Sequence, residues 1–263
     1  LIVPMKYGLF PGGKKIRSKI LIDIGKIFFV KYSKLIKIGA AVECIHAYSL
    51  IHDDLPCMDN DLIRRGKPST HVKYGESTAV LAGNSLLTLA FEILSDKKLN
   101  INNSLKIRLI KELSLCSGHT GIAGGQFLDL DYEKKKKTIK KIVDMQIKKT
   151  GKLFSFCCFS PAIISNKNEK IIRKFKIIGD EIGLLFQIAD DLIDISVSSK
   201  KVGKKTKKDK KKGKATFISL LGHKNTIIYA EKLKLRIQKK LKNYGYKSNG
   251  IIQTLEYILN RTK

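Results

Sequence analysis

Two apolar stretches that each end in a cluster of aspartates constrain this chain most. The first, over residues 43–66, reads ECIHAYSLIHDDLPCMDNDLIRRG, and the second, over residues 183–194, reads GLLFQIADDLID. On a helix, Asp190 and Asp194 would share a face, where like charges repel unless a cation offsets them. Clustered carboxylates suit a hard cation such as Mg²⁺ carrying a substrate phosphate. The two stretches therefore predict acidic helix ends that face each other across one cavity and are bridged by Mg²⁺ and a diphosphate.

The helix that carries the first aspartates is predicted to end near Leu55. Pro56 disfavours the α conformation at the residue before it. On a straight helix, Asp59 would lie about 240° round from Asp53. A turn after the helix would allow both carboxylates to reach the same metal ions.

Basic side chains indicate two further anion sites. Arg64 and Arg65 follow the first aspartates, and guanidinium groups match phosphate oxygens in geometry. Near the start of the sequence, paired glycines before Lys14 let the backbone turn tightly, and Lys14 and Arg17 would share a face of the next helix. The alternatives are a solvated basic turn after an acidic helix end and an ordinary basic helix start.

On these motifs, the sequence resembles the trans-isoprenyl diphosphate synthases, in particular the bacterial farnesyl diphosphate synthases. The motifs are Asp53-Asp54-Leu55-Pro56-Cys57-Met58-Asp59 with Arg64-Arg65-Gly66, Asp190-Asp191-Leu192-Ile193-Asp194 after Phe186 and Gln187, Gly12-Gly13-Lys14 with Arg17, Gly124-Gly125-Gln126, and Lys149-Thr150-Gly151. The resemblance covers nearly the whole chain. One departure is Ser18, where the family usually has proline after the arginine.

The resemblance implies an all-α fold, an isoprenoid synthase-type bundle of about ten helices around a deep central cavity. It also implies a single polyprenyl synthetase domain over residues 1–263 and a homodimer. Residues 196–216, which are rich in lysine, would form a lid loop; the alternative is a charged loop without a function. The sequence starts at Leu1, and the family's usual opening helical segment is missing, so we expect a truncated fragment or a non-standard start.

The resemblance further implies a Mg²⁺-dependent prenyl transfer, with three Mg²⁺ ions in each active site. The metal ligands would be Asp53, Asp54, Asp59, Asp190, Asp191 and Asp194. Arg64, Lys149, Lys204 and Lys214 would bind the allylic diphosphate, while Thr150 and Gln187 would hold the allylic cation. Isopentenyl diphosphate would be bound by Lys14, Arg17, His46 and Arg65. A helical histidine such as His46 is otherwise more often a core residue.

Tyr48 is the residue from which product length is predicted. It precedes Asp53 by five positions, about 7.5 Å along a helix. In the family, an aromatic side chain at this place stops growth at fifteen carbons, and the small Ser49 leaves Tyr48 to block the cavity alone. The alternative is a core tyrosine whose hydroxyl is satisfied elsewhere.

Composition excludes some functions. The net charge of +29 invites a nucleic-acid function, but the lysines are spread along the chain rather than interleaved with aromatic residues, so no specific nucleic-acid partner is expected. Five cysteines without a CxxC pair indicate reduced thiols in a cytoplasmic protein. The longest apolar run, over residues 153–164, is too short to span a bilayer, so no transmembrane segment is expected.

The sequence leaves three alternative functions to compare with a farnesyl diphosphate synthase. A geranylgeranyl (C20) diphosphate synthase of the same family would differ mainly at the cavity floor, where Tyr48 argues against it. A terpene cyclase would normally lack the Lys14/Arg17 and Arg64/Arg65 pairs. A non-catalytic homologue that binds prenyl diphosphates would be expected to lose one acidic motif, and both are intact.

Overall fold

The computed structural model describes residues 1–133, 137–200 and 216–260. The chain divides into two compact units. Unit 1 comprises Leu1–Ser114 and Ser160–Lys167, and unit 2 comprises Leu115–Phe159 and Asn168–Lys263.

Unit 1 is built mainly of helices. Its elements are α1 (Ile2–Leu9), α2 (Ile16–Ile27), α3 (Tyr32–Asp53), β1 (Ile63–Arg64), β2 (Lys67–Pro68), α4 (Thr70–Tyr74), α5 (Glu76–Ser95) and η1 (Lys97–Leu99). Two further helices, α6 (Asn103–Ser117) and α9 (Lys152–Ile164), contribute residues to both units.

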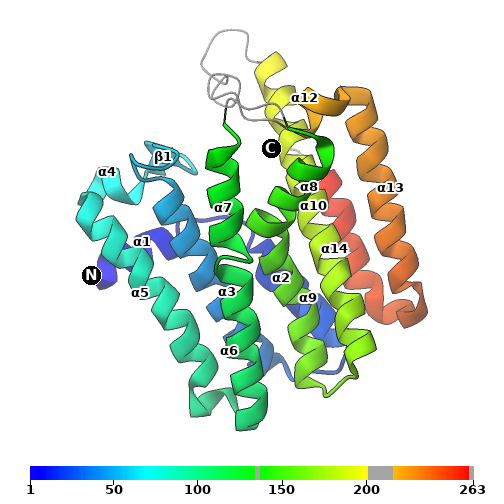
Figure 1. Ribbon diagram of the computed structural model, residues 1–263. Helices are drawn as coiled ribbons and strands as arrows, with labels where there is room; N and C mark the ends of the chain where they lie inside the picture. The colour runs from blue at the N-terminus through cyan, green and yellow to red at the C-terminus, as the bar shows by residue number, and fades with distance from the viewer. Residues whose placement is uncertain (134–136, 201–215, 261–263) are drawn as a thin grey trace. The chain divides into compact units, whose positions relative to one another are not determined.

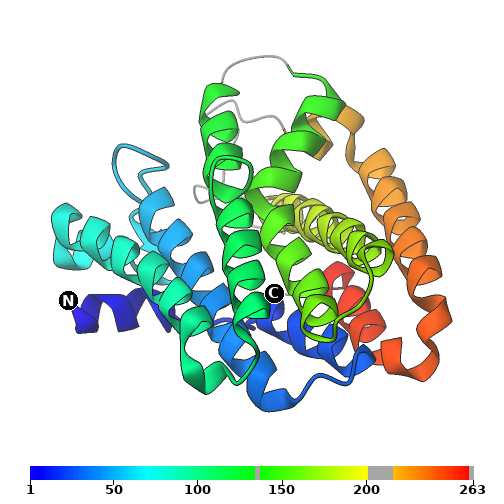
Figure 2. The same cartoon turned by 60° about the horizontal axis from the view of Figure 1, so that its bottom comes forward.

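Helix α3 is the centre of unit 1. It packs against α2 and α5, and both views show α3 and α5 side by side (Figures 1 and 2). Leu35, Ile38, Val42 and Ile45 recur at three- and four-residue spacing and are almost completely buried, as expected for the core face of a helix. The helix ends at Asp53, three residues before Pro56. This core holds the first acidic motif at one end of a rigid element.

Helix α5 is long and apolar enough to cross a membrane by length and composition, and one third of its most apolar window is buried. A buried core helix can meet the same criterion. Here α5 packs along α3, and its buried residues are mostly small, including Ala79, Ala82, Gly83 and Ala90. We therefore interpret α5 as a core helix of unit 1.

Unit 2 is also helical. Its elements are α7 (Ile122–Asp131), α8 (Ile139–Gln146), a π-helix labelled η2 (Ile147–Gly151), α10 (Glu169–Lys200), α12 (Phe217–Leu221), α13 (His223–Leu241), η3 (Lys242–Ser248) and α14 (Asn249–Leu259). The long helix α10 contacts η2, α13 and α14. Large apolar side chains such as Phe154, Phe175 and Leu185 are fully buried within this unit. Its core therefore fixes the helix that carries the second acidic motif.

The all-α prediction is confirmed, with two differences in detail. Strands β1 and β2 pair Ile63 with Pro68 and Arg64 with Lys67, a ribbon too short to produce an alternating sequence pattern. The lid loop was predicted to begin at residue 196, which is wrong, because α10 continues to Lys200. The rest of the predicted lid, residues 201–215, lies outside the described residues.

Candidate functional site

The first acidic motif forms a closed turn at the end of α3. The backbone N–H of Asp59 donates to the carbonyl oxygen of Asp53 at 2.8 Å, and that of Asp61 donates to Asp54 at 3.1 Å. Asn60 adopts a positive φ of 50°, a conformation that asparagine tolerates better than most residues. The turn thus returns Asp59 to the helix end beside Asp53, as the break at Pro56 predicts.

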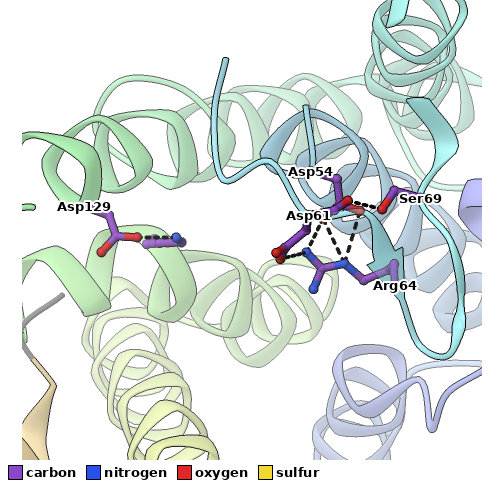
Figure 3. Close-up of polar contacts among 6 residues, drawn as sticks. Asp54, Asp61, Arg64, Ser69 and Asp129 are labelled. Carbon is purple, nitrogen blue, oxygen red and sulfur yellow. Dashed lines mark hydrogen bonds and ion pairs between the residues drawn. The ribbon is translucent and has the colours of Figure 1, made fainter. Parts of the chain in front are cut away.

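Within this turn, Asp54 is paired with Arg64. Its side chain is buried, and the Nε of Arg64 donates to both carboxylate oxygens, at 3.1 Å and 3.2 Å. Arg64 also lies 3.5 Å from Asp61, whose carbonyl accepts from Ser69 (Figure 3). Burial raises the pKa of Asp54, an effect that Arg64 partly offsets. The metal role of Asp54 and the diphosphate role of Arg64 stay predictions, but here each is the other's partner.

A hairpin turn aims the two neighbouring arginines at different partners. Arg65 and Gly66 connect β1 to β2, and both have positive φ values, 52° and 77°, as a two-residue hairpin turn requires. Arg64 reaches Asp54, whereas Arg65 donates to the carbonyl oxygen of Gly12. A Cβ on Gly13 would meet the Arg65 guanidinium at 2.3 Å, so the paired glycines make room for this arginine.

The residues predicted to bind isopentenyl diphosphate meet at the first turn of α2. Arg17 lies 3.1 Å from the Nε2 of His46, and Lys14 is exposed just before the helix. Burial lowers the pKa of His46 well below its ordinary value, and the charges of Arg17, Arg65, Lys15 and Arg64 lower it further. His46 is therefore neutral, and its Nε2 accepts a hydrogen bond from Arg17. The arrangement is a basic cluster around a neutral imidazole.

This imidazole gives the folded state a measurable pH dependence. The pKa of His46 is lower in the folded chain than its ordinary value of 6.5, so the unfolded chain binds a proton here at a higher pH than the folded chain does. The free energy of unfolding therefore falls as the pH drops below 6.5. We expect the melting temperature of wild type to fall more between about pH 7 and about pH 5 than that of His46→Gln. The exposed His223→Gln serves as the control, and equal pH slopes in wild type and His46→Gln would contradict this account.

In unit 2, three glycines bring the remaining motifs into contact. A Cβ on Gly125 would lie 2.1 Å from the backbone nitrogen of Lys149, and one on Gly183 would lie 2.4 Å from the Cα of Gly151. These close approaches hold the π-helix between α7 and α10. Single π-helical turns are rare and occur frequently at functional sites. The packing explains why the two glycine motifs, far apart in sequence, belong to one structural feature.

We expect Gly125→Ala to destabilise the protein. The added methyl group would overlap the backbone of Lys149, and overpacking of this kind costs about 1–3 kcal/mol. For a chain of this size, each kcal/mol lowers the melting temperature by roughly 2–4 °C. Thermal unfolding followed by circular dichroism measures the shift. A melting temperature equal to that of wild type would show that the contact is not tight.

Side chains from the π-helix reach the second acidic motif through a short chain of hydrogen bonds. The hydroxyl of Thr150 donates to the side-chain oxygen of Gln187 at 3.4 Å, and Gln187 donates to Asp191 at 3.1 Å. The other carboxylate oxygen of Asp191 accepts from the backbone N–H of Phe217 at 3.2 Å. The predicted Thr150, Gln187 and Asp191 are thus brought together, and Asp191 has protein partners at both oxygens.

Lys149 is paired with an aspartate that lies outside both acidic motifs. Its Nζ lies 2.6 Å from Asp129 of α7, and the ion pair is drawn at the labelled Asp129 in Figure 3. Both side chains are largely buried. The ion pair therefore holds the positive charge of Lys149 in one position.

The metal ligands were predicted from both units. Asp53 and Asp59 lie in the closed turn, and Asp190 is half-buried on α10, which also carries Asp194. No three acidic, histidine or cysteine side chains gather around one point among the residues described. The donors are nonetheless carboxylate oxygens, the ligands that Mg²⁺ prefers, so the residues fit this ion chemically. Lys204 and Lys214 lie outside the described residues.

Tyr48 contacts the histidine that precedes the first aspartates. Its ring stands edge-on to His52, with centroids 5.7 Å apart, and His52 lies 3.1 Å from the carbonyl oxygen of Val80 on α5. A Cβ on Gly83 would lie 2.1 Å from the Nε2 of His52, so the absence of a side chain at Gly83 leaves room for the imidazole. Burial and the charge of Asp53 raise the pKa of Tyr48 to about 12. The tyrosine is therefore uncharged and packs on His52, which in turn contacts α5.

Sequence reasoning missed one buried acid of this site. Glu43 lies three residues before His46 and accepts hydrogen bonds from Ser18, while Lys15 lies 3.3 Å from it. The available signal was its position on the buried face of an apolar helix, where a carboxylate is rarely found without a partner.

Comparisons with known proteins agree on the family. Residues 1–258 match the family model described as Polyprenyl synthetase. The chain is 38% identical to a farnesyl diphosphate synthase of Escherichia coli, over 100% of this chain and 90% of that protein. It is also 36% identical to a geranylgeranyl diphosphate synthase of Cyanophora paradoxa, over 98% of this chain and 86% of that protein.

Solved structures show the same likeness. An FPP/GFPP synthase from Zymomonas mobilis, in the apo state, superposes with a TM-score of 0.88 at 37% identity and covers 98% of this chain and 87% of its own. A geranyltransferase from Helicobacter pylori, complexed with magnesium and isoprenyl diphosphate, gives a TM-score of 0.84 at 33% identity, with coverage of 98% and 86%.

Proposed function

This chain belongs to the polyprenyl synthetase family and is a prenyltransferase of isoprenoid biosynthesis, and we propose that its product is farnesyl diphosphate. In the proposed reaction, isopentenyl diphosphate condenses head to tail with dimethylallyl or geranyl diphosphate and releases diphosphate. The reaction requires Mg²⁺, in keeping with the magnesium in the Helicobacter pylori relative.

One observation carries the proposal: α3 presents His46, which Arg17 of α2 contacts, and the acidic turn on the same side. His46, with Arg17 beside it, lies seven residues before Asp53, which is two helical turns or about 10 Å along the axis. A reaction between two diphosphate esters needs one site for the substrate that keeps its diphosphate and another for the substrate that loses it. A metal-free cationic site and a carboxylate site, held by one rigid helix, supply this pair.

The residues would divide the work as follows. Arg17, Arg65 and Lys14 bind the diphosphate of isopentenyl diphosphate, and the neutral His46 orients Arg17. Asp53, Asp59, Asp190 and Asp194 would hold Mg²⁺, three ions by family resemblance, whose charge stabilises the departing diphosphate.

The π-helix region would act on the allylic part. Lys149, fixed by Asp129, adds positive charge for the leaving group, and Thr150 and Gln187 direct oxygen dipoles at the allylic cation. The double bond of isopentenyl diphosphate attacks that carbon, and the departing diphosphate takes the final proton. In this scheme Lys204 and Lys214, outside the described residues, would close over the diphosphate and exclude water.

Tyr48 favours the fifteen-carbon product over the geranylgeranyl alternative. Its uncharged ring is packed on His52 and lies five residues before Asp53, about 7.5 Å along the helix, so it has little freedom to move aside. A growing chain that starts at Asp53 and runs along α3 would meet this ring.

We also propose that the protein is a homodimer. Exposed apolar residues on unit 1 include Val80 and Leu81 of α5 and Ile107 of α6, with 39%, 55% and 67% of their surfaces exposed. Exposed apolar residues that form a contiguous patch are typical of an interaction surface, and Val80 and Leu81 are adjacent on α5. Cytoplasmic localisation stays a prediction.

A condensation assay tests the chemistry. Labelled isopentenyl diphosphate is incubated with dimethylallyl diphosphate, and transfer of label into a product extractable by organic solvent after dephosphorylation is followed with Mg²⁺ or with a chelator in excess. We expect transfer that depends on both Mg²⁺ and the allylic substrate. Transfer that persists in the chelator would contradict the metal assignment, and the absence of transfer by the folded protein would contradict the function.

A further inference from the structure

The first turn of α2 is capped by a side chain from another helix. The N-cap residue, Lys15, has a left-handed conformation and makes no side-chain cap hydrogen bond. The first backbone N–H groups of a helix have no partner within the helix. Here the N–H of Ser18 donates to the Oε1 of Glu43 on α3 at 3.3 Å. The carboxylate thus lies where the helix dipole favours a negative charge.

The side chain of Ser18 strengthens the same contact. Its hydroxyl lies 2.7 Å from the Oε1 of Glu43 and 3.3 Å from the carbonyl oxygen of Gly39. Because a hydroxyl carries one proton, it donates to one of these acceptors at a time, and the carboxylate is the shorter and stronger partner. A Cβ on Gly39 would come within 3.4 Å of Ser18, so the glycine lets the two helices approach closely here.

Glu43 also holds the lysine at the start of α2. The Nζ of Lys15 lies 3.3 Å from the Oε2 of Glu43 and donates to the carbonyl oxygen of Leu9 at 2.8 Å. Glu43 thus uses one oxygen for Ser18 and the other for Lys15. About nine-tenths of Glu43 is buried, so its charge needs both partners.

These contacts lie next to the predicted diphosphate-binding residues. Arg17 and Ser18 are adjacent on α2, and Glu43 and His46 are three residues apart on one face of α3. Arg17 contacts His46 and Ser18 contacts Glu43, so two neighbouring side-chain pairs connect the same two helices. Because Ser18 and Arg17 are adjacent, the Ser18–Glu43 contact also fixes the position of the Arg17 guanidinium relative to α3.

We propose that Ser18 and Glu43 form a positioning clamp that holds the first turn of α2 on α3 and thereby fixes Arg17 for the diphosphate of isopentenyl diphosphate. The proposal rests on the function proposed above. Neither residue touches the reacting atoms. The clamp acts on one substrate only, because the allylic diphosphate is assigned to other residues.

Steady-state kinetics of Ser18→Ala, Glu43→Gln and the double variant test the clamp. We expect each single variant to raise the KM for isopentenyl diphosphate by about three- to tenfold, the size of a typical net hydrogen bond. The KM for the allylic substrate and kcat should change less than about twofold. Because the two residues act through one contact, Ser18→Ala should have a smaller effect in the Glu43→Gln background than in wild type.

Two matched controls separate the clamp from general weakening. Ser165→Ala removes a hydroxyl that donates to the carbonyl oxygen of Phe28 at 3.2 Å in the same unit, and Glu92→Gln removes an exposed charge on α5. Both should leave the KM values unchanged. An unchanged KM for isopentenyl diphosphate in both clamp variants would overturn the proposal, as would equal increases in the KM for both substrates.

A binding measurement keeps the clamp testable if the protein does not catalyse condensation. Inorganic diphosphate is titrated calorimetrically into each variant without Mg²⁺. The Arg17→Ala variant measures how much diphosphate binds to other basic residues of the chain. We expect three- to tenfold weaker binding in both clamp variants than in wild type. Weaker binding without condensation would support the clamp and reject the proposed function, whereas wild-type affinity in both variants would reject the clamp.

Discussion

Asp53→Asn will lower turnover on the order of a thousandfold without destabilising the fold, whereas Asp54→Asn will lower the melting temperature. The first expectation follows from the proposed metal role of Asp53, because the site would lose charge that stabilises the departing diphosphate. The charge of Asp53 acts on Arg64 less than those of Asp54 and Asp61 do, so an amide at Asp53 should leave the folded state about as stable as wild type.

The expectation for Asp54 follows from its pairing. Its carboxylate is buried and accepts from Arg64 at both oxygens, so an amide would leave the guanidinium with only one acceptor there. Losing one partner of a largely buried ion pair costs about 3–5 kcal/mol. At roughly 2–4 °C per kcal/mol for a chain of this size, the melting temperature should fall by roughly 10 °C.

Turnover and thermal unfolding of the two variants, measured side by side, separate the roles. Asp131→Asn, an aspartate at the end of α7 outside both acidic motifs, is the control. An Asp53→Asn variant that keeps a tenth or more of the wild-type turnover would refute its assignment as a metal ligand. An Asp54→Asn variant as stable as wild type would show that Arg64 finds other partners.

Tyr48→Ala will move the main product from fifteen carbons to twenty or more. The substitution removes a ring that is packed edge-on to His52 and leaves space along α3 behind the acidic turn. The first two condensations should proceed at rates close to those of wild type, because the ring lies about 7.5 Å from Asp53 along the helix.

Tyr48→Phe is the matched control, since it keeps the ring and removes only the hydroxyl. Its product should remain at fifteen carbons. The pKa of Tyr48 is about 12, so the tyrosine stays uncharged, and wild-type product length should not change between neutral and moderately alkaline pH. A Tyr48→Ala product of unchanged length would place the floor of the cavity elsewhere.

Some of the helices could be predicted from the sequence because their signals are local. The apolar stretches that lead into the two aspartate clusters predicted helices there, which are α3 and α10, and Pro56 predicted the turn that returns Asp59 to Asp53. The predicted start of the lid, residue 196, lies within α10, because serine and lysine are compatible with the last turns of a helix although the composition there is polar.

The pairings inside the site could not be predicted, because they depend on contacts between residues far apart in sequence. Asp54 was assigned to a metal on its motif alone, and only the hairpin at Arg65–Gly66 shows that Arg64 reaches it. Glu43 is recognisable in the sequence as a carboxylate on an apolar helix. Its partners could not be predicted, because Ser18 and Lys15 come from the start of α2. The π-helix likewise follows from the close approach of Gly125 to Lys149 rather than from any local pattern.

The most direct test of the account is the carbon number of the product. The protein is incubated with dimethylallyl diphosphate, isopentenyl diphosphate and Mg²⁺, and the dephosphorylated products are separated by chain length. We expect a dominant fifteen-carbon alcohol even when isopentenyl diphosphate is in excess. A dominant product of twenty carbons or more would contradict the role of Tyr48 and favour the geranylgeranyl alternative.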